Sequence, residues 1–214
     1  THYPKPFARD LRLAREAGAD FIFSPTVQQL YPDGFVSRIH VGPLGERWEG
    51  RSRPGHFDGV ATVVSILFHL TQPTTAYFGQ KDYQQTLVIR RLVDDLRLDL
   101  RLRVLPTVRE PDGLAMSSRN QYLSVRQRRQ AAVLFRALRA GRSRIRAGER
   151  RAAVVMSAMR RLIRQAPDAR IDYVAAVDGA TLESVRRLRA RVALLVAVRV
   201  GRTRLIDNLL VDVS

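Results

Sequence analysis

The residues that decide the fold are 75–105, TAYFGQKDYQQTLVIRRLVDDLRLDLRLRVL. Thr75 to Phe78 is a short apolar segment, which is typical of a buried strand. In Asp82 to Leu96 the apolar residues recur at helical spacing, and Leu98 to Leu105 has the pattern of a strand again. A strand, a helix and a strand at this spacing predict a βαβ unit, so we expect an α/β fold with a parallel sheet at its centre.

The residues before this unit predict shorter elements. We expect a helix over Phe7 to Ala17, a short strand over Asp20 to Phe23, a turn at Tyr31 to Gly34 and an extended stretch from Phe35 to Val41. Gly59 to Leu70 is apolar on nearly every side, which predicts a buried helix.

After Pro106 the pattern changes to long helices followed by strands. Helices are predicted over 124–147 and about 151–165, separated by Gly148, and Ser124 with Gln127 forms a capping box at the first of them. Strands follow near 171–177, 192–200 and 203–211, the last two joined as a hairpin at Gly201 and Arg202.

These patterns predict two domains with a boundary near residue 107. Residues 1–107 would form the domain with the parallel sheet, and residues 108–214 a smaller α+β domain. The 214 residues are enough for both, and 45% hydrophobic with 27% charged residues is ordinary for a globular protein.

Several classes of protein are excluded by composition. With no cysteine there is no disulfide, thiolate zinc site or cysteine nucleophile. No apolar run approaches the roughly 18–20 residues of a membrane helix, and no secretory signal is visible, so secretion is not indicated and we expect no membrane partner. The four histidines, at 2, 40, 56 and 69, have no metal-ligand spacing, so we expect no histidine metal site.

The charge is unusual, because 37 basic and 20 acidic residues leave a net charge of +17. Residues 1–126 carry +4 of it and residues 127–214 carry +13, nearly all as arginine. The basic stretch also has the pattern of an amphipathic helix, whose apolar face is opposite Arg128, Arg139, Arg142 and Arg146. A solvated helix face is the favoured interpretation, and a polyanion-binding face is the alternative. Nucleic acid is not favoured, since no aromatic residues are interleaved for base stacking.

The strongest chemical signal is the segment from Gly79 to Gln85. It lies where a strand ends and a helix begins, which is where open α/β sheets bind nucleotides. Lys81 is informative, because a cation at a helix N-terminus is disfavoured unless an anion such as phosphate lies between them. A solvated turn lysine remains the alternative. Asp82 and Gln85 also fit a capping box, so spacing does not separate a cap from a ligand contact.

A second candidate segment runs from Val108 to Asn120. Ser117, Ser118 and Arg119 offer two hydroxyls and a planar double donor, which suit a polyphosphate. Such runs are also common in surface loops, and this alternative stays open.

A third candidate segment, from Arg53 to Phe57, precedes the predicted buried helix. His56 in it could contact a substrate or could be a helix-entry residue bonded to backbone.

Together these segments resemble the pantothenate synthetase (pantoate–β-alanine ligase) family. The resemblance covers the whole chain and is carried by S-R-P-G-H-F-D-G-V at 52–60, Y-F-G-Q-K-D-Y-Q-Q at 77–85, R-E-P-D-G-L-A-M-S-S-R-N-Q-Y-L at 109–123 and G-R-T-R-L-I-D-N at 201–208.

The resemblance implies a Rossmann-like nucleotidyltransferase domain, incomplete at its N-terminus, with a smaller C-terminal domain that closes over the site, usually in a cytoplasmic homodimer. It implies that ATP and (R)-pantoate, with Mg²⁺, give pantoyl adenylate and pyrophosphate, and that the amine of β-alanine then displaces AMP. The phosphate-binding and catalytic positions would be Lys81, Ser117, Ser118 and Arg119. Other ATP contacts would be Gly79, Gln80, Asp82, Val108 and Met116, and the substrate contacts Gln85, Arg53 and His56.

The sequence departs from the family in two places. Gln80 stands where glutamate is usual, and the family's His-x-Gly-His motif is not found in these residues. The chain begins at Thr1-His2-Tyr3-Pro4, which resembles the family's interior, so about the first quarter to third of the family's length is expected to be missing. We therefore expect this chain by itself to be impaired or inactive. Two alternatives are a non-catalytic remnant that binds a polyanion through its arginine-rich helices, and a full enzyme whose gene start was misplaced.

Overall fold

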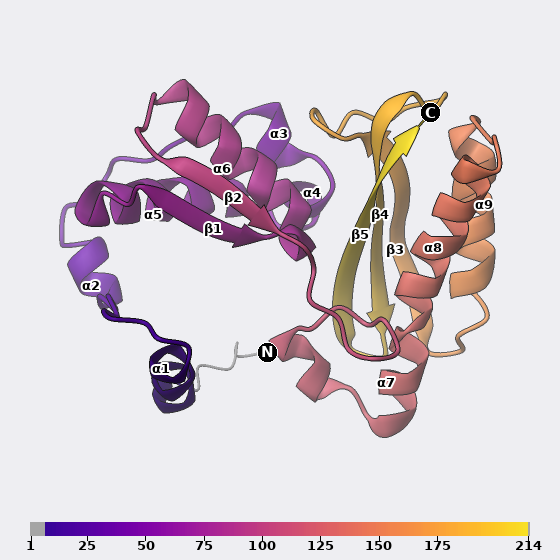
Figure 1. The fold of residues 1–214 in the computed structure, drawn as a ribbon, viewed down its shortest axis with the longest axis horizontal. Helices are drawn as coiled ribbons and strands as arrows, with labels where there is room; N and C mark the ends of the chain where they lie inside the picture. The colour runs from indigo at the N-terminus through magenta and orange to yellow at the C-terminus, as the bar shows by residue number, and fades with distance from the viewer. Residues whose placement is uncertain (1–6, 214) are drawn as a thin grey trace. The chain divides into compact units, whose positions relative to one another are not determined.

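The computed structural model describes residues 7–213 (Figure 1). The start of the chain discussed above, Thr1 to Pro4 with His2, lies outside the described residues. The chain divides into two compact units, Thr1–Arg38 and Ile39–Ser214.

The first unit contains two helices. Helix α1 (Phe7–Glu16) matches the predicted helix, and α2 (Val27–Leu30) is a single turn with a capping box at Thr26. The turn after Tyr31 is confirmed by the Phe35 N–H, which donates to the Pro32 carbonyl at 3.0 Å. The strand predicted at Asp20 to Phe23 is wrong: no described segment pairs with this stretch, and a strand exists only where its backbone is paired.

The second unit contains the βαβ element that the sequence predicts. Strands β1 (Thr75–Gly79) and β2 (Arg101–Leu105) pair in parallel, and helix α6 (Tyr83–Asp95) connects them. Between β1 and α6 the short 3₁₀ turn η1 (Gln80–Asp82) carries the strongest predicted site segment. The strand predicted from Leu98 begins later than expected, at Arg101.

Helix α5 (His56–Thr71) packs against α6. It is buried on one side, through Ala61, Val64 and Phe68, whereas Leu70 is 59% exposed. The prediction of a helix is confirmed, but burial on every side is not. The stretch from Phe35 to Val41, predicted to be extended, has no regular secondary structure. At its end, the N–H groups of Ile39 and Val41 donate to Thr62 Oγ1 and Asp58 Oδ1 of α5. Two short helices, α3 (Pro43–Glu46) and α4 (Glu49–Ser52), complete this part.

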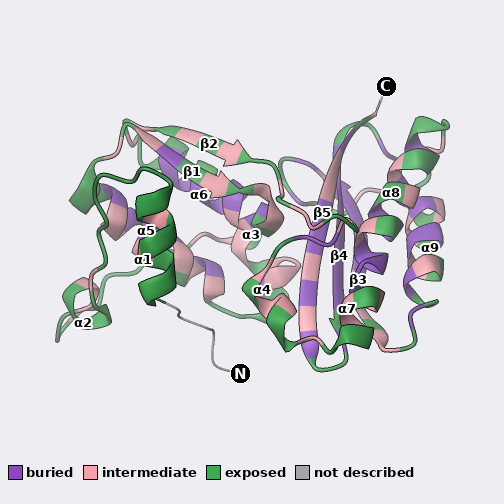
Figure 2. Ribbon diagram, turned by 60° about the horizontal axis from the view of Figure 1, so that its bottom comes forward, coloured by how far each residue is buried: buried purple, intermediate pink, exposed green. Residues whose placement is uncertain are grey.

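The remaining residues form an antiparallel sheet covered by helices. Strands β3 (Ala169–Asp178), β4 (Ala190–Val200) and β5 (Thr203–Val213) follow one another across the sheet, and the predicted hairpin at Gly201 is confirmed. The central strand β4 is almost wholly buried (Figure 2). One face packs on α8 (Val133–Arg146) and α9 (Ala152–Ile163), and the other on the start of α6 through Tyr83 and Leu87.

The long helix predicted over 124–147 is in fact two helices. Helix α7 (Val125–Ala131) begins with the predicted capping box and ends at Ala132, where α8 starts in a new direction (Figure 1). The four consecutive residues from Ala131 to Leu134 are all buried. One face of a straight helix cannot bury four residues in a row, so the chain turns there. Gly148, with φ +95°, separates α8 from α9 as predicted.

No helix within residues 7–213 is long and apolar enough to cross a membrane.

Candidate active site

Two of the predicted site segments meet at one small cavity. Lys81 from η1 and Ser117 and Arg119 from the loop after β2 line a space of about 10 Å³, together with Arg204 and Asp207 of β5. A space of this size is about enough for one water molecule. The remaining lining residues are Leu114, Ala115, Asn120, Leu134, Leu205 and Ile206. The sequence predicts Lys81, Ser117 and Arg119 as phosphate ligands, and the fold places them together.

The turn at Gly79 to Asp82 leaves polar side chains available. Asp82 precedes α6 but makes no side-chain cap bond, so the capping box that its sequence spacing allows is not formed. Gln85 has no side-chain hydrogen bond within residues 7–213. Lys81 Nζ lies 3.4 Å from Asp82 Oδ1, and no other carboxylate of the described residues pairs with it. Gln85 is therefore available to a ligand, and Asp82 is held only by the exposed pair with Lys81.

The backbone of this turn is held by Asn208 of β5. Its side-chain amide donates to the carbonyls of Gln80 and Lys81, both at 2.9 Å, and its oxygen accepts from Gln80 Nε2 at 3.3 Å. Because Asn208 is 3% exposed, these bonds are made away from solvent. In the sequence, residues 201–208 stand out only as part of the family resemblance, which assigns no role to any one of them. The signal that could have found Asn208 is the polar pair Asp207-Asn208 between the apolar residues Leu205-Ile206 and Leu209-Leu210 of the strand.

The loop that carries Ser117 and Arg119 is anchored at several points. Arg109 binds Asp207 and also lies over the Phe135 ring, 3.9 Å from its centroid. Glu110 and Asp112 both bind Arg128 of α7, so Arg128 is ion-paired and does not belong to a solvated helix face.

The polar groups at the tip of this loop differ in availability. Ser117 Oγ accepts the N–H of Arg119 at 3.2 Å and so begins the turn η2 (Ser118–Tyr122). Ser118 is exposed, and its hydroxyl has no partner within residues 7–213. The half-buried guanidinium of Arg119 also lacks a carboxylate partner there. A half-buried unpaired cation is costly unless an anion joins it, which points to a negatively charged ligand.

Val108 and Met116 lie beside each other on two adjoining backbone stretches. The N–H of Met116 donates to the Val108 carbonyl at 2.9 Å. Met116 is 55% exposed and Val108 is 66% exposed. Together they form a small exposed apolar surface on the loop that follows β2.

The third predicted segment lies outside the cavity. Arg53 and His56 line a separate open hollow of about 440 Å³ at the start of α5. Arg53 Nη1 and His56 Nε2 are 2.8 Å apart. Burial and the charge of Arg53 lower the pKa of His56, so the ring is neutral near pH 7 and its Nε2 accepts from Arg53. His56 begins α5, its backbone N–H donates to the Arg53 carbonyl at 3.1 Å, and its ring is bonded to the Arg53 side chain.

A network that the sequence does not reveal holds Arg204 at the cavity. Arg204 binds both oxygens of Glu49, at 2.6 and 2.8 Å, and Tyr173 donates its hydroxyl to the same carboxylate at 2.8 Å. Glu49 is four residues before Arg53. Burial, and then the positive charges of Arg119 and Arg204, lower the pKa of Arg53.

The donor set does not suit a metal held by protein ligands. Within residues 7–213 no three His, Asp or Glu side chains are grouped as a metal site. The carboxylate in the cavity, Asp207, is already bound to Arg109, and the other charged groups there are cations. The arrangement can bind an anion with several negative charges.

Comparison with known proteins identifies the same chemistry. The family model for pantoate-beta-alanine ligase matches residues 1–210. The pantothenate synthetase of Moorella thermoacetica is 53% identical over 212 residues, which cover 99% of this chain and 75% of the relative; that of Roseiflexus sp. is 52% identical. The crystal structure of the Thermus thermophilus enzyme matches with TM-score 0.93 and 49% identity, over 97% of this chain and 75% of that one. A Francisella tularensis pantoate-beta-alanine ligase, described as complexed with Beta-gamma ATP and beta-alanine, matches with TM-score 0.75 and 32% identity, over 97% and 71%.

Proposed function

The chain belongs to the pantoate–β-alanine ligase family, and from that membership we propose that it serves the ATP-dependent condensation of (R)-pantoate with β-alanine. The carboxylate of pantoate attacks the α-phosphorus of ATP, which forms pantoyl adenylate and releases pyrophosphate. The amine of β-alanine then attacks the acyl carbon, which gives pantothenate and AMP. The observation that carries the proposal is the meeting of Lys81, Ser117 and Arg119 at one cavity.

Both steps require neutralisation of negative charge on phosphate. Charge increases on the oxygens of the α-phosphate and on the departing pyrophosphate, so fixed cations lower the barrier. We assign this role to Lys81 and Arg119. Ser118 adds a free hydroxyl donor, and Ser117 adds a hydroxyl that also shapes the turn before Arg119.

The nucleoside part of ATP would lie along the ends of the same segments. We assign Gly79, Gln80 and Asp82 to the ribose side, where the space around Gly79 is open and a Cβ there would meet nothing within 4 Å. Val108 and Met116 supply the exposed apolar surface that suits the face of adenine.

The acid and amine substrates would lie toward α5. We assign Gln85 to pantoate because its amide is available beside the turn, and we assign Arg53 and His56 to the pantoate and β-alanine end. With Nε2 accepting from Arg53, the neutral His56 ring has its Nδ1–H left to donate to an oxygen of a substrate.

Mg²⁺ would arrive with the substrate as the MgATP complex, because the described residues do not supply a metal-binding set of their own. In that complex the ion neutralises phosphate charge. We also propose, from family membership, a homodimer in the cytoplasm and a functional division near residue 107 between the Rossmann-like part and the smaller α+β part.

The test measures ATP binding and AMP release separately. Calorimetric titration with a non-hydrolysable ATP analogue is expected to show one site per chain. Because this chain by itself is expected to be impaired, AMP formation is expected to be slow, and the AMP that forms is expected to require both pantoate and β-alanine. Lys81→Ala and Arg119→Ala should each reduce the rate of AMP formation about 100-fold, as loss of a transition-state donor typically does.

Arg97→Ala is the matched control, because this exposed arginine lies at the end of α6 away from the cavity. The proposal fails if the analogue does not bind, or if the lysine and arginine variants bind and react like the control.

A further inference from the structure

The outer face of helices α8 and α9 carries a concentration of arginines without acidic partners. Residues 133–164 contain ten arginines and one carboxylate, Glu149, which is bound to Arg151. Six of these arginines are exposed and form no ion pair within residues 7–213. They are Arg136, Arg139, Arg144, Arg146, Arg161 and Arg164.

Some exposed arginines of this chain find partners, since Arg12 pairs with Glu16 at 3.1 Å and Arg191 pairs with Asp212 at 2.6 Å. Others, such as Arg97 and Arg103, form no ion pair within residues 7–213. What distinguishes α8 and α9 is the density of unpaired arginines, because the one carboxylate of residues 133–164 is bound to Arg151. The positive potential there is therefore left for an external anion.

The arginines are arranged in a way that suits an extended anion. Arg136, Arg139 and Arg146 recur at helical spacing, so they form one line along roughly 15 Å of α8. Arg144 projects from α8 about 140° round the helix from Arg139. There, between the two helices, it borders a hollow of about 340 Å³ that Arg161 also lines. Its other lining residues are small or medium-sized: Ala153, Val154, Ser157 and Ala158.

The same face lacks what other partners would need. Among the described residues, no large hydrophobic side chain is exposed after Val125. A protein partner would need aromatic or aliphatic anchors, and a membrane surface would need an apolar face to insert. Base stacking on a single strand would need aromatic rings. Regularly spaced guanidinium groups without anchors match a phosphodiester backbone.

We propose that the α8–α9 face, defined by the six arginines above, binds the phosphate backbone of a nucleic acid duplex without reading its sequence. This is a second activity that does not depend on the ligase reaction. It differs from the expectation drawn from the sequence, in which the lack of stacking aromatics disfavours nucleic acid. Contacts to phosphate need no aromatic residues, and the structure shows that these arginines are unpaired within residues 7–213.

The test is a fluorescence-anisotropy titration of a labelled duplex of about 20 base pairs between 50 and 200 mM NaCl. With about four phosphates neutralised, affinity should fall about 100-fold over this range, and a second duplex of unrelated sequence should bind equally. Arg144→Glu/Arg161→Glu should reduce affinity at least tenfold at the lower salt concentration. RNA and DNA duplexes are compared as separate arms, and either one binding in this way supports the proposal.

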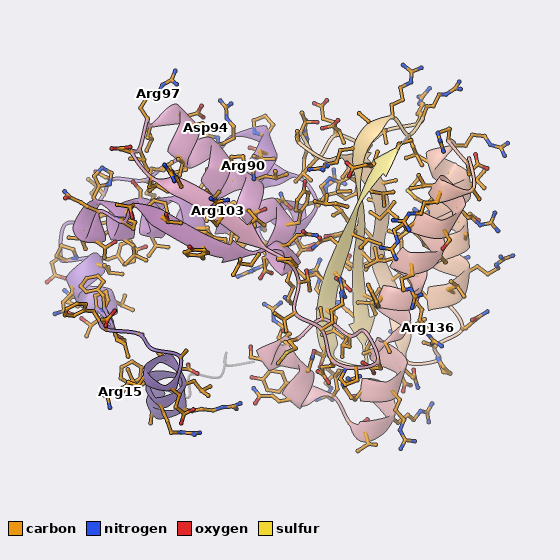
Figure 3. The ribbon with its side chains drawn as sticks, in the orientation of Figure 1. Arg15, Arg90, Asp94, Arg97, Arg103 and Arg136 are labelled. Atoms are coloured by element: carbon orange, nitrogen blue, oxygen red, sulfur yellow. The ribbon has the colours of Figure 1, made fainter. Side chains whose placement is uncertain are left out.

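Arg97→Glu/Arg103→Glu is the matched control, because it changes the net charge equally at exposed arginines of the parallel-sheet part (Figure 3). Circular dichroism melting checks that both variants are folded. The proposal is overturned if the two double variants lose affinity equally, since the effect is then net charge alone. It is also overturned by tighter binding to a single strand, or by affinity that does not change with salt.

Discussion

Arg109 and Asp207, 98 residues apart in the sequence, form a two-pronged ion pair. Nη1 lies 2.7 Å from Oδ2 and Nη2 lies 2.9 Å from Oδ1, and the Asp207 side chain is 1% exposed. The pair fastens the loop of Ser117 and Arg119 to strand β5. Because β5 also supplies Asn208, one strand positions both segments that we propose to bind phosphate.

Asp207→Asn should destabilise the protein strongly. Asparagine keeps the shape but leaves the Arg109 charge inside the protein without a counter-charge, and such a loss costs about 3 kcal/mol in the free energy of unfolding. Urea denaturation measures it. Asp212→Asn, at the exposed pair with Arg191, is the control and should leave the denaturation midpoint nearly unchanged. Equal shifts in the two variants would show that the buried pair has no special role.

Asn208→Asp should damage nucleotide binding more than Asn208→Ala does. Aspartate cannot donate, so it would place a negative charge against the carbonyls of Gln80 and Lys81 where two hydrogen bonds now hold the turn. For the aspartate variant we expect the binding free energy of the ATP analogue to weaken by about 2 kcal/mol. The reason is that a buried carboxylate would face two carbonyl oxygens with no hydrogen-bond donor between them. Calorimetry compares the two variants, and equal affinity would exclude Asn208 as the support of the turn.

Glu49 and Arg204 should be energetically coupled. In a double-mutant cycle with Glu49→Gln and Arg204→Met we expect a coupling free energy of about 2 kcal/mol in unfolding, because the pair is mostly buried and two-pronged. Tyr173→Phe should reduce the stability by about 1 kcal/mol through the lost hydrogen bond to Glu49. Additive effects in the cycle would contradict the network described for this site.

His40 and His56 should titrate on opposite sides of the ordinary histidine pKa of 6.5. The hydrogen bond to Asp58 raises the pKa of His40, whereas burial and Arg53 lower that of His56. By linkage, the His40 contribution to stability is fully present below about pH 6.5 and is lost as pH rises through its folded pKa. For His56 the sign is reversed, so stability falls as pH drops below about 6.5.

Proton NMR of the imidazole C–H signals measures both midpoints. Arg53→Ala should move the His56 midpoint upward and leave that of His40 in place. A His56 midpoint above its ordinary value in the unsubstituted chain would show that its ring is not the acceptor from Arg53.

Gly113→Ala should cost stability, whereas Gly59→Ala should add some. Gly113 has φ +90°, which favours glycine, and a Cβ there would collide with the Phe135 ring beneath Arg109. We expect a loss of about 2–3 kcal/mol. Gly59 lies inside α5 in open space, so alanine should stabilise by about 0.5–1 kcal/mol. Thermal unfolding of both variants tests the contrast, which a stable Gly113 variant would contradict.

Local chemistry explains which elements could be predicted. The βαβ unit at 75–105, the capping box at Ser124, the break at Gly148 and the hairpin at Gly201 follow from periodicity and turn residues, and all of them are found. The strand at Asp20 to Phe23 failed because pairing depends on a partner that a local pattern does not contain. The helix over 124–147 failed because burial of Ala131 to Leu134 depends on both the sheet and α9.

The sequence by itself determined the residue types of the candidate site, since Lys81, Ser117, Ser118 and Arg119 stand in recognisable segments. Only the tertiary structure decided how they are held and how they meet. Hydrogen bonds from Asn208 and the ion pairs of Asp207 and Arg204 join residues about 100 or more positions apart, and no local spacing encodes such contacts. The structure also decided that the positive charge of α8 and α9 is unpaired within residues 7–213, because ion pairing depends on which side chains the fold brings within reach of one another.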